Sequence, residues 1–208
     1  MKLKKKPKMI LITIGIITAI TLVGTIGYKV FFDKKEVKEV KILNTIKEYD
    51  YKLKDSKTKK YKEMFGELEK ILSEKSVDEE KYVKKISEMF IYDFYSLNDK
   101  VAKTDVGGVD FVYQPVMPNF LENAENTYYK YVESNIYNDR KQELPVVDEI
   151  TIDDVTQEEY EYEKTSDEKA YKVKVNWTYT DTNYDSYQKE ATLVFIHDGI
   201  KLSLVELK

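Results

Sequence analysis

The sequence predicts an α+β protein: an N-terminal transmembrane helix, then about three helices packed on a curved antiparallel sheet of about four to five strands. Three observations predict this class. A long uncharged apolar run lies near the start of the chain, amphipathic stretches with a helical period follow it, and after Pro145 the apolar period changes from 3.6 to two. Helices followed by an antiparallel meander are typical of α+β domains.

Composition excludes several function classes. The chain has 208 residues, no cysteine, one histidine and a single arginine, Arg140. The lack of cysteine excludes disulfides, thiolate metal sites and thiol nucleophiles. The single histidine excludes metal sites that need two or more imidazole ligands. Residues 1–32 carry six lysines and no acid, whereas residues 33–208 carry 28 basic and 38 acidic groups. An acidic body of this kind repels nucleic acid, so we expect no nucleic-acid partner, and we assign no metal or cofactor.

The apolar run from Met9 to Tyr28 contains twenty residues without a charge. A helix of that length spans about 30 Å, which matches the hydrocarbon core of a bilayer. We expect a retained membrane anchor over residues 9–32, interfacial belt included, after a basic tail over residues 1–8. A cleavable signal peptide is the alternative, but the run is long for one and Thr25-Ile26-Gly27 is a poor cleavage site. The anchor residues singled out are Met9, Ile10, Leu11, Leu22, Val23 and Tyr28.

The orientation of this anchor follows from the basic tail. Five lysines precede the run and five follow it, so the count of positive charges does not decide. A short tail with five lysines crosses a membrane less readily than a long domain, so we expect a cytoplasmic N-terminus at the plasma membrane. The expected partners are the lipid bilayer, other membrane or envelope proteins, and a second copy of the chain, which Gly15 and Ala19 would let approach closely.

Residues 33–50 are highly charged and carry an apolar residue at every third position. Val37, Val40 and Leu43 belong to this series. The spacing predicts a helical stalk over residues 33–50, with the extracytoplasmic domain occupying residues 51–208.

Three amphipathic helices are expected in that domain. The first covers residues 57–73, and the second covers residues 76–95, opened by a capping box of Ser76 and Glu79. The third is expected to begin at Asn119 as its N-cap and to continue to Val132. The inner faces consist of Tyr61, Met64, Phe65, Leu68, Ile71 and Leu72, then Tyr82, Val83, Ile86, Phe90 and Phe94, then Leu121, Ala124, Tyr128, Tyr131 and Val132.

Strands are expected at five places. The glycine pair in residues 105–113 indicates a turn or bulge that leads into a short strand. Residues 146–163 form a strand or a bent pair, residues 171–179 alternate strictly, and residues 191–197 are apolar on both sides. The Asp198-Gly199 dipeptide predicts a two-residue hairpin turn into residues 200–204.

This order of elements resembles the nuclear-transport-factor-two-like cone fold. Members of that superfamily occur as membrane-tethered domains in the bridge and scaffold proteins of type IV secretion and Gram-positive conjugation systems. The resemblance covers about residues 51–208 plus the anchor, and it depends on element order alone, so it assigns no site residue. It implies a cone-like domain that serves protein–protein assembly. Steroid isomerases and dehydratases share the cone, so fold does not determine function.

Candidate chemistry is sparse. His197 with Asp198 resembles an oriented general base, but its position at a hairpin end indicates an ordinary surface histidine. Asp181-x-Asn183-x-Asp185 resembles the start of a calcium loop, but Ser186 stands where glycine is required and Thr192 where glutamate is required. The same residues suit a turn. We therefore assign no catalytic and no metal-binding residue.

Two compositional features have alternative interpretations. Residues 143–168 contain eleven acidic residues and one lysine, which fits either a solvated sheet face or a docking face for a cationic partner. The many tyrosines fit core packing, a partner-binding surface or a small-molecule cavity. The tyrosines considered are Tyr128, Tyr129, Tyr131, Tyr160, Tyr162, Tyr171, Tyr179, Tyr184 and Tyr187.

The leading hypothesis is a single-pass membrane protein with a non-catalytic extracytoplasmic assembly domain. An enzyme or small-molecule-binding cone is the alternative from another class. It requires a tyrosine-lined cavity with a buried carboxylate, Asp93 or Asp110, whose pKa is raised by desolvation. A module that binds cell-wall polymer is a third hypothesis.

Overall fold

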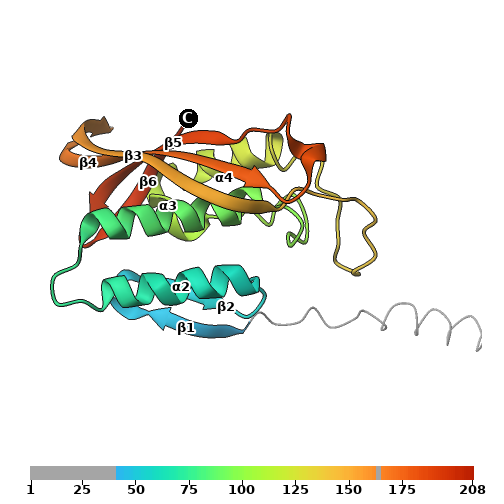
Figure 1. Cartoon of the computed structure of the whole chain (residues 1–208), viewed down its shortest axis with the longest axis horizontal. Helices are drawn as coiled ribbons and strands as arrows, with labels where there is room; N and C mark the ends of the chain where they lie inside the picture. The colour runs from blue at the N-terminus through green and yellow to red at the C-terminus, as the bar shows by residue number, and fades with distance from the viewer. Residues whose placement is uncertain (1–40, 163–164) are drawn as a thin grey trace, which may run out of the picture. The chain divides into compact units, whose positions relative to one another are not determined.

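The computed structural model describes residues 41–162 and 165–208. They belong to one compact unit that begins at Val40. Three α-helices, a two-stranded sheet and a four-stranded antiparallel sheet make up the described chain (Figure 1), which confirms the α+β class. The predicted tail and anchor over residues 1–32, and residues 33–40 of the predicted stalk, lie outside the described residues.

The first described element is a hairpin of β1 (Ile42–Ile46) and β2 (Tyr51–Lys54). The prediction of a helix to residue 50, with the domain beginning at 51, is therefore wrong at its C-terminal end. Tyr51 and Leu53 alternate with Lys52 and face the core, so the relevant period is two. Asp50 adopts a left-handed φ of 50°, which lets the chain reverse between the strands.

Helix α2 (Lys59–Leu72) confirms the first predicted helix, and Thr58 caps it by accepting from the Tyr61 N–H. Helix α3 (Glu79–Tyr95) confirms the second, but the capping box of Ser76 is wrong. The Asp78 side chain accepts from the Lys81 N–H instead, and Glu79 and Glu80 complement the positive end of the helix dipole. Aspartate caps as well as serine does, so two candidates two residues apart could not be ranked from sequence.

Helix α4 (Met117–Asn126) is shorter than expected. Pro118 lies in its first turn, so Asn119 is inside the helix and is not its N-cap. The helix ends at Asn126, and hydrogen-bonded turns replace the predicted last helical turn up to Val132. Tyr129 is nevertheless fully buried, and its hydroxyl donates to the Phe94 carbonyl.

The expected strand in residues 105–113 is reduced to one bridge. A 3₁₀ turn (Val109–Phe111) precedes a single parallel pairing of Val112 with Leu204. The glycine pair before it is required by close approach. A Cβ on Gly107 would lie 1.9 Å from the Asp93 carbonyl oxygen, and Gly108 has a φ of 75°.

The large sheet runs in the order β3 (Val147–Tyr162), β4 (Thr165–Tyr179), β5 (Glu190–Asp198) and β6 (Lys201–Leu207). Every neighbouring pair is antiparallel, as predicted. The turn between β5 and β6 consists of Gly199 and Ile200, because Asp198 already pairs with Lys201. The predicted Asp198-Gly199 turn was therefore one residue early.

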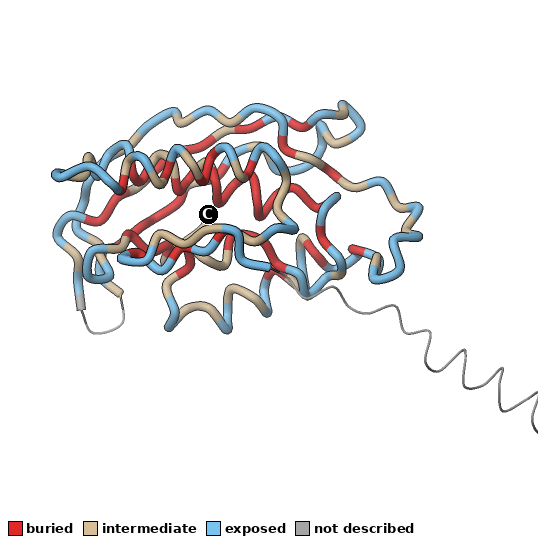
Figure 2. The backbone as a smooth tube through the Cα atoms, turned by 90° about the horizontal axis from the view of Figure 1, so that it is seen from below, coloured by how far each residue is buried: buried red, intermediate tan, exposed pale blue. Residues whose placement is uncertain are grey.

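Helix α3 packs against β3 and β4, and α2 packs on α3. Figure 1 shows α3 between the sheet and α2, and Figure 2 shows buried residues concentrated on the inner sides of these elements. On β4 the alternating set expected from the sequence is buried, which confirms that one face of the strand lines the core. The set is Tyr171, Val173, Val175, Trp177 and Tyr179.

Candidate functional site

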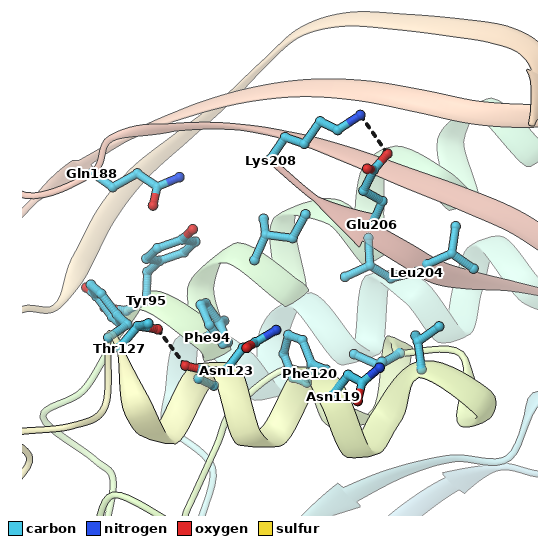
Figure 3. A pocket seen from close by; sticks show the side chains of 16 residues that line it. Phe94, Tyr95, Asn119, Phe120, Asn123, Thr127, Gln188, Leu204, Glu206 and Lys208 are labelled. Carbon is cyan, nitrogen blue, oxygen red and sulfur yellow. Dashed lines mark hydrogen bonds and ion pairs between the residues drawn. The ribbon is translucent and has the colours of Figure 1, made fainter. Parts of the chain in front are cut away.

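A groove of about 500 Å³ lies between α4 and the C-terminal half of β6. Figure 3 shows α4 on one side of it, β6 on the other, and the side chains of Phe94 and Phe120 pointing into it. The apolar lining includes Phe94, Tyr95, Val112, Val116, Phe120, Ala124, Tyr128, Leu204, Val205 and Leu207. We name this feature the α4–β6 groove. Its volume is within the range of sites that bind small ligands or a few peptide side chains.

The polar rim of the groove is supplied mainly by one side of α4. Asn119, Asn123 and Thr127 are spaced four residues apart, so they follow one another along the same face of the helix and into the turn after it. The Thr127 hydroxyl donates to the Asn123 carbonyl oxygen at 2.6 Å. Gln188, from the loop before β5, completes the rim. These groups are neutral hydrogen-bond donors and acceptors.

The two charged side chains that line the groove, those of Glu206 and Lys208, balance each other. Its carboxylate, Glu206, is 2.9 Å from the ammonium of Lys208. The hydrogen bond and the charge of Glu206 raise the pKa of Lys208. Burial raises the pKa of Tyr95 and Tyr128, so both phenols stay protonated, and Tyr128 donates to the Tyr95 carbonyl. The arrangement suits an uncharged ligand.

β6 is an edge strand, and its outer backbone groups are covered only in its first half. The Leu202 N–H donates to the Tyr82 hydroxyl, and the Leu204 carbonyl accepts from the Tyr113 N–H at 2.8 Å. Lys208 exchanges two hydrogen bonds with Thr192 of the neighbouring strand. The N–H and C=O of Leu207, one residue earlier, therefore point away from β5. Within the described residues they have no backbone partner, and they lie beside the groove.

The structure contradicts the hypothesis that Asp93 is a carboxylate with a raised pKa in a cavity. Asp93 does not line the groove. Its oxygens accept from Lys57 Nζ at 2.6 Å, from Lys100 Nζ at 2.9 Å and from the Gly108 N–H at 2.8 Å. Burial alone would raise the pKa of Asp93, but the two ammonium groups and this N–H hold the pKa well below its ordinary value. Asp93 therefore has the contacts of a structural anion.

Asp110 behaves as expected in one respect. Burial raises the pKa of its carboxyl, and nearby Lys54 and Lys57 only partly offset the effect. Asp110 does not line the α4–β6 groove, however. Its backbone carbonyl accepts from Lys201 Nζ at 2.9 Å, which ties the turn after Gly108 to the start of β6.

His197 does pair with a carboxylate, but with Asp167 of β4 and not with Asp198. His197 Nδ1 is 2.8 Å from Asp167 Oδ2, which also accepts from the His197 backbone N–H. Burial alone would raise the pKa of Asp167, but these hydrogen bonds lower it. His197 Nε2 lies 3.6 Å from Glu79 at the start of α3, and Tyr171 donates to the same carboxylate. The histidine thus joins three elements.

The calcium-like Asp181-x-Asn183-x-Asp185 segment is a turn. The Asp181 side chain accepts from the Asn183 N–H, and Asp185 pairs with Lys189. Across residues 41–162 and 165–208 no group of three or more histidine, aspartate or glutamate side chains could hold a metal ion.

The tyrosines divide between packing and surface. Tyr128, Tyr179, Tyr184 and Tyr187 form an edge-to-face cluster beside the groove. Tyr131, expected on the inner side of a helix, is instead largely exposed. Packing is therefore one role of the tyrosines, although Tyr95 and Tyr128 also line the α4–β6 groove.

The comparisons with known proteins add no relationship. Among the described residues no helix has both the length and the apolar character that a bilayer span requires, and the predicted anchor lies outside them. No family model, curated protein or solved structure matches the chain.

Proposed function

We propose that this chain is a single-pass membrane protein whose extracytoplasmic domain binds an extended, uncharged segment of a partner protein in the α4–β6 groove. The observation that carries the proposal is the joint position of an apolar groove and outward-pointing backbone groups at Leu207. The domain acts as an adaptor and not as an enzyme.

An extended segment fits this site better than a helix. A peptide strand laid along β6 would exchange hydrogen bonds with the N–H and C=O of Leu207 and would continue the edge that residues 112–113 begin. Alternate side chains of such a strand would point into the groove, between Phe94 and Phe120 on its floor. The amides of Asn119 and Asn123 suit the peptide's polar backbone groups.

The tether and its orientation depend on the sequence. The uncharged run from Met9 to Tyr28, with five lysines before it, supports an anchor with a cytoplasmic N-terminus. A tethered adaptor assembles with other membrane or envelope proteins, and secretion and conjugation complexes are the setting that the resemblance implies.

A peptide selection tests the groove. The full chain in lipid nanodiscs is screened against a phage-displayed library of random peptides, and selected peptides are measured against Asn123→Trp, which fills the groove. Glu122→Trp, one residue away on α4 and outside the lining, is the matched control. We expect apolar peptides that lose at least about tenfold in affinity, about 1.4 kcal/mol, on Asn123→Trp and little on Glu122→Trp.

Strand addition makes a second requirement. Peptides N-methylated at the backbone positions facing Leu207 should bind much more weakly, because they lose the donor of a main-chain hydrogen bond. Selected peptides that bind both tryptophan variants equally, or that tolerate N-methylation at every position, would contradict the proposal.

A further inference from the structure

Two loops at one end of the domain expose an apolar surface. Val101 lies in the loop after α3, and Tyr131, Ile136 and Tyr137 lie in the loop between α4 and β3; their side chains are between 46 and 75% exposed. We name these four residues the tyrosine-loop surface. Large apolar side chains gathered in adjoining loops mark a surface that contacts something apolar.

The surface is held in place by a hydrogen-bond network. The Asn135 N–H donates to the Val101 carbonyl at 2.7 Å, which joins the two loops. The Gln142 amide donates to the Tyr131 carbonyl at 2.8 Å. The guanidinium of Arg140 donates to three backbone carbonyls, those of Asn98, Lys100 and Glu133. These loops therefore present their apolar side chains from a fixed backbone.

The charge of these loops differs from that of the rest of the domain. Residues 41–208 carry 25 basic and 35 acidic residues, whereas the loops 97–105 and 127–146 together carry five of each. An acidic surface would be repelled by anionic lipid headgroups, and a neutral one is not. This end is therefore better suited than the acidic sheet to approach a membrane.

The described chain, which starts at Lys41, begins at the same end of the domain. The Asp55 N–H donates to the Lys41 carbonyl, Lys57 and Lys100 share Asp93, and Arg140 contacts the Lys100 carbonyl. Figure 1 shows the start of β1 and the loop before β3 at one end of the domain, and the turn between β5 and β6 at the other.

We propose that the tyrosine-loop surface lies in the interfacial region of the bilayer that anchors the chain. This inference rests on the proposed membrane anchor. Only residues 33–40 separate that segment from the described domain, and eight residues span at most about 30 Å. Tyrosine suits the interface because its ring is apolar and its hydroxyl remains hydrated.

Because the chain has no cysteine, single-cysteine variants give clean reporters. The full chain carries an environment-sensitive fluorophore at Ile136→Cys and is reconstituted in phosphatidylcholine–phosphatidylglycerol vesicles, with or without lipid that bears a quencher near the headgroup. Ile200→Cys is the matched control, since Ile200 is 61% exposed and Ile136 is 57% exposed. It lies near the start of α3, and α3 is about 25 Å long. Ile20→Cys reports on the anchor, and Tyr137→Cys replaces Ile136→Cys if the latter misfolds.

We expect several-fold stronger lipid quenching at residue 136 or 137 than at residue 200, with residue 20 quenched by lipid bearing a deep quencher. If lipid quenches the fluorophore at residue 20 but aqueous iodide fully quenches the one at residue 136, this inference is overturned and the anchor is not. Residue 20 open to iodide would instead refute the anchor. If the fluorescence at residue 136 instead changes with the protein-to-lipid ratio and lipid does not quench it, the surface contacts a second copy of the chain. That result would contradict the proposal.

Discussion

The two edges of the large sheet differ in how they avoid pairing with other chains. β3 is 16 residues long and carries seven acidic residues and no basic one, and its pairing with β4 is interrupted by three irregularities in register. β6 is seven residues long and carries one lysine and one glutamate, and the Tyr82 hydroxyl and residues 112–113 cover its first half. Charge and register irregularities protect the β3 edge. The β6 edge is protected by the residues that cover its first half, and its last part lies uncovered beside the α4–β6 groove.

This difference bears on the alternatives for residues 143–168. Lys172 pairs with Glu158 and Asn176 contacts Asp153, but all seven acidic residues of β3 are exposed. An edge that repels other strands by charge is expected to remain unpaired, which favours the interpretation of a solvated face. The α4–β6 groove lies beside the other edge, β6.

The largest expected effect on stability is at Asp93, whose carboxylate holds the turn at Gly108 that leads to the residues covering β6. Asp93→Asn would leave Lys57 and Lys100 without their shared carboxylate and weaken the contact to Gly108. Breaking a buried pair in this way costs about 4 kcal/mol. Urea unfolding of the detergent-solubilised chain, followed by the fluorescence of Trp177, the only tryptophan, measures the change.

The same variant has a defined pH dependence. Because the folded pKa of Asp93 is lowered, its stabilising contribution is complete above the unfolded value of about 3.9 and is lost as pH falls toward the folded value. The difference between wild type and Asp93→Asn should be constant at neutral pH and shrink below pH of about 4. A difference that grows on acidification would refute this role.

Gly107→Ala should have the next largest effect. Its Cβ would collide with the Asp93 carbonyl oxygen, so the segment that leads to Val112 would have to move, at a cost of about 3 kcal/mol. Gly66→Ala in α2 is the control, because no atom lies within 4 Å of its Cβ, and it should stabilise by about 0.5–1 kcal/mol. Thermal unfolding compares them; equal effects would show that the glycine turn does not depend on close approach.

Tyr82→Phe should cost about 2 kcal/mol. It removes the hydroxyl that accepts from the Leu202 N–H and bonds the Tyr51 hydroxyl at 2.6 Å, which leaves buried polar groups unpaired. Hydrogen exchange at the Leu202 amide should become faster than at the Leu204 amide. Unchanged exchange at residue 202 would mean that Tyr82 does not cover this edge.

The smallest effect on stability is expected on β3. Replacing Asp154, Glu159 and Glu161 by threonine should change the free energy of unfolding by less than about 0.5 kcal/mol per site, since all three are exposed. Association should nevertheless increase, because threonine favours strands and the protecting charge is gone. Sedimentation velocity of the detergent-solubilised chain measures it.

The control for that experiment removes the same charge elsewhere. Glu48, Glu63 and Glu74 are exposed and lie outside the large sheet, so their replacement by threonine tests net charge alone. If both triple variants associate equally, the acids act through net charge and the edge is not specifically protected.

The sequence predicted elements that have an uninterrupted period. The helix over residues 57–73 and the strand over residues 171–179 were found because their apolar residues repeat without a break. The β1–β2 hairpin was missed because strands of five and four residues are too short to separate a period of two from one of three.

The groove and the ion cluster were missed for a different reason. They join residues distant in sequence: Leu204 faces α4, and Lys57 reaches Asp93 over 36 positions. The same holds for His197, whose partner Asp167 is 30 residues away while Asp198 is adjacent. The four-residue spacing of Asn119, Asn123 and Thr127 beside Phe120 was the only available signal, and it marks a polar helix side rather than a recess.

The contacts of the Arg140 guanidinium explain why the only arginine of this lysine-rich chain stands at this position. Thirty-three of its 34 basic residues are lysine, and the one arginine stands where two nitrogens of one rigid plane donate to three carbonyls. An ammonium is a single point of charge and cannot reproduce that fork. Replacement of Arg140 by lysine keeps the charge but would lose contacts that join the loop after α3 to the loop before β3.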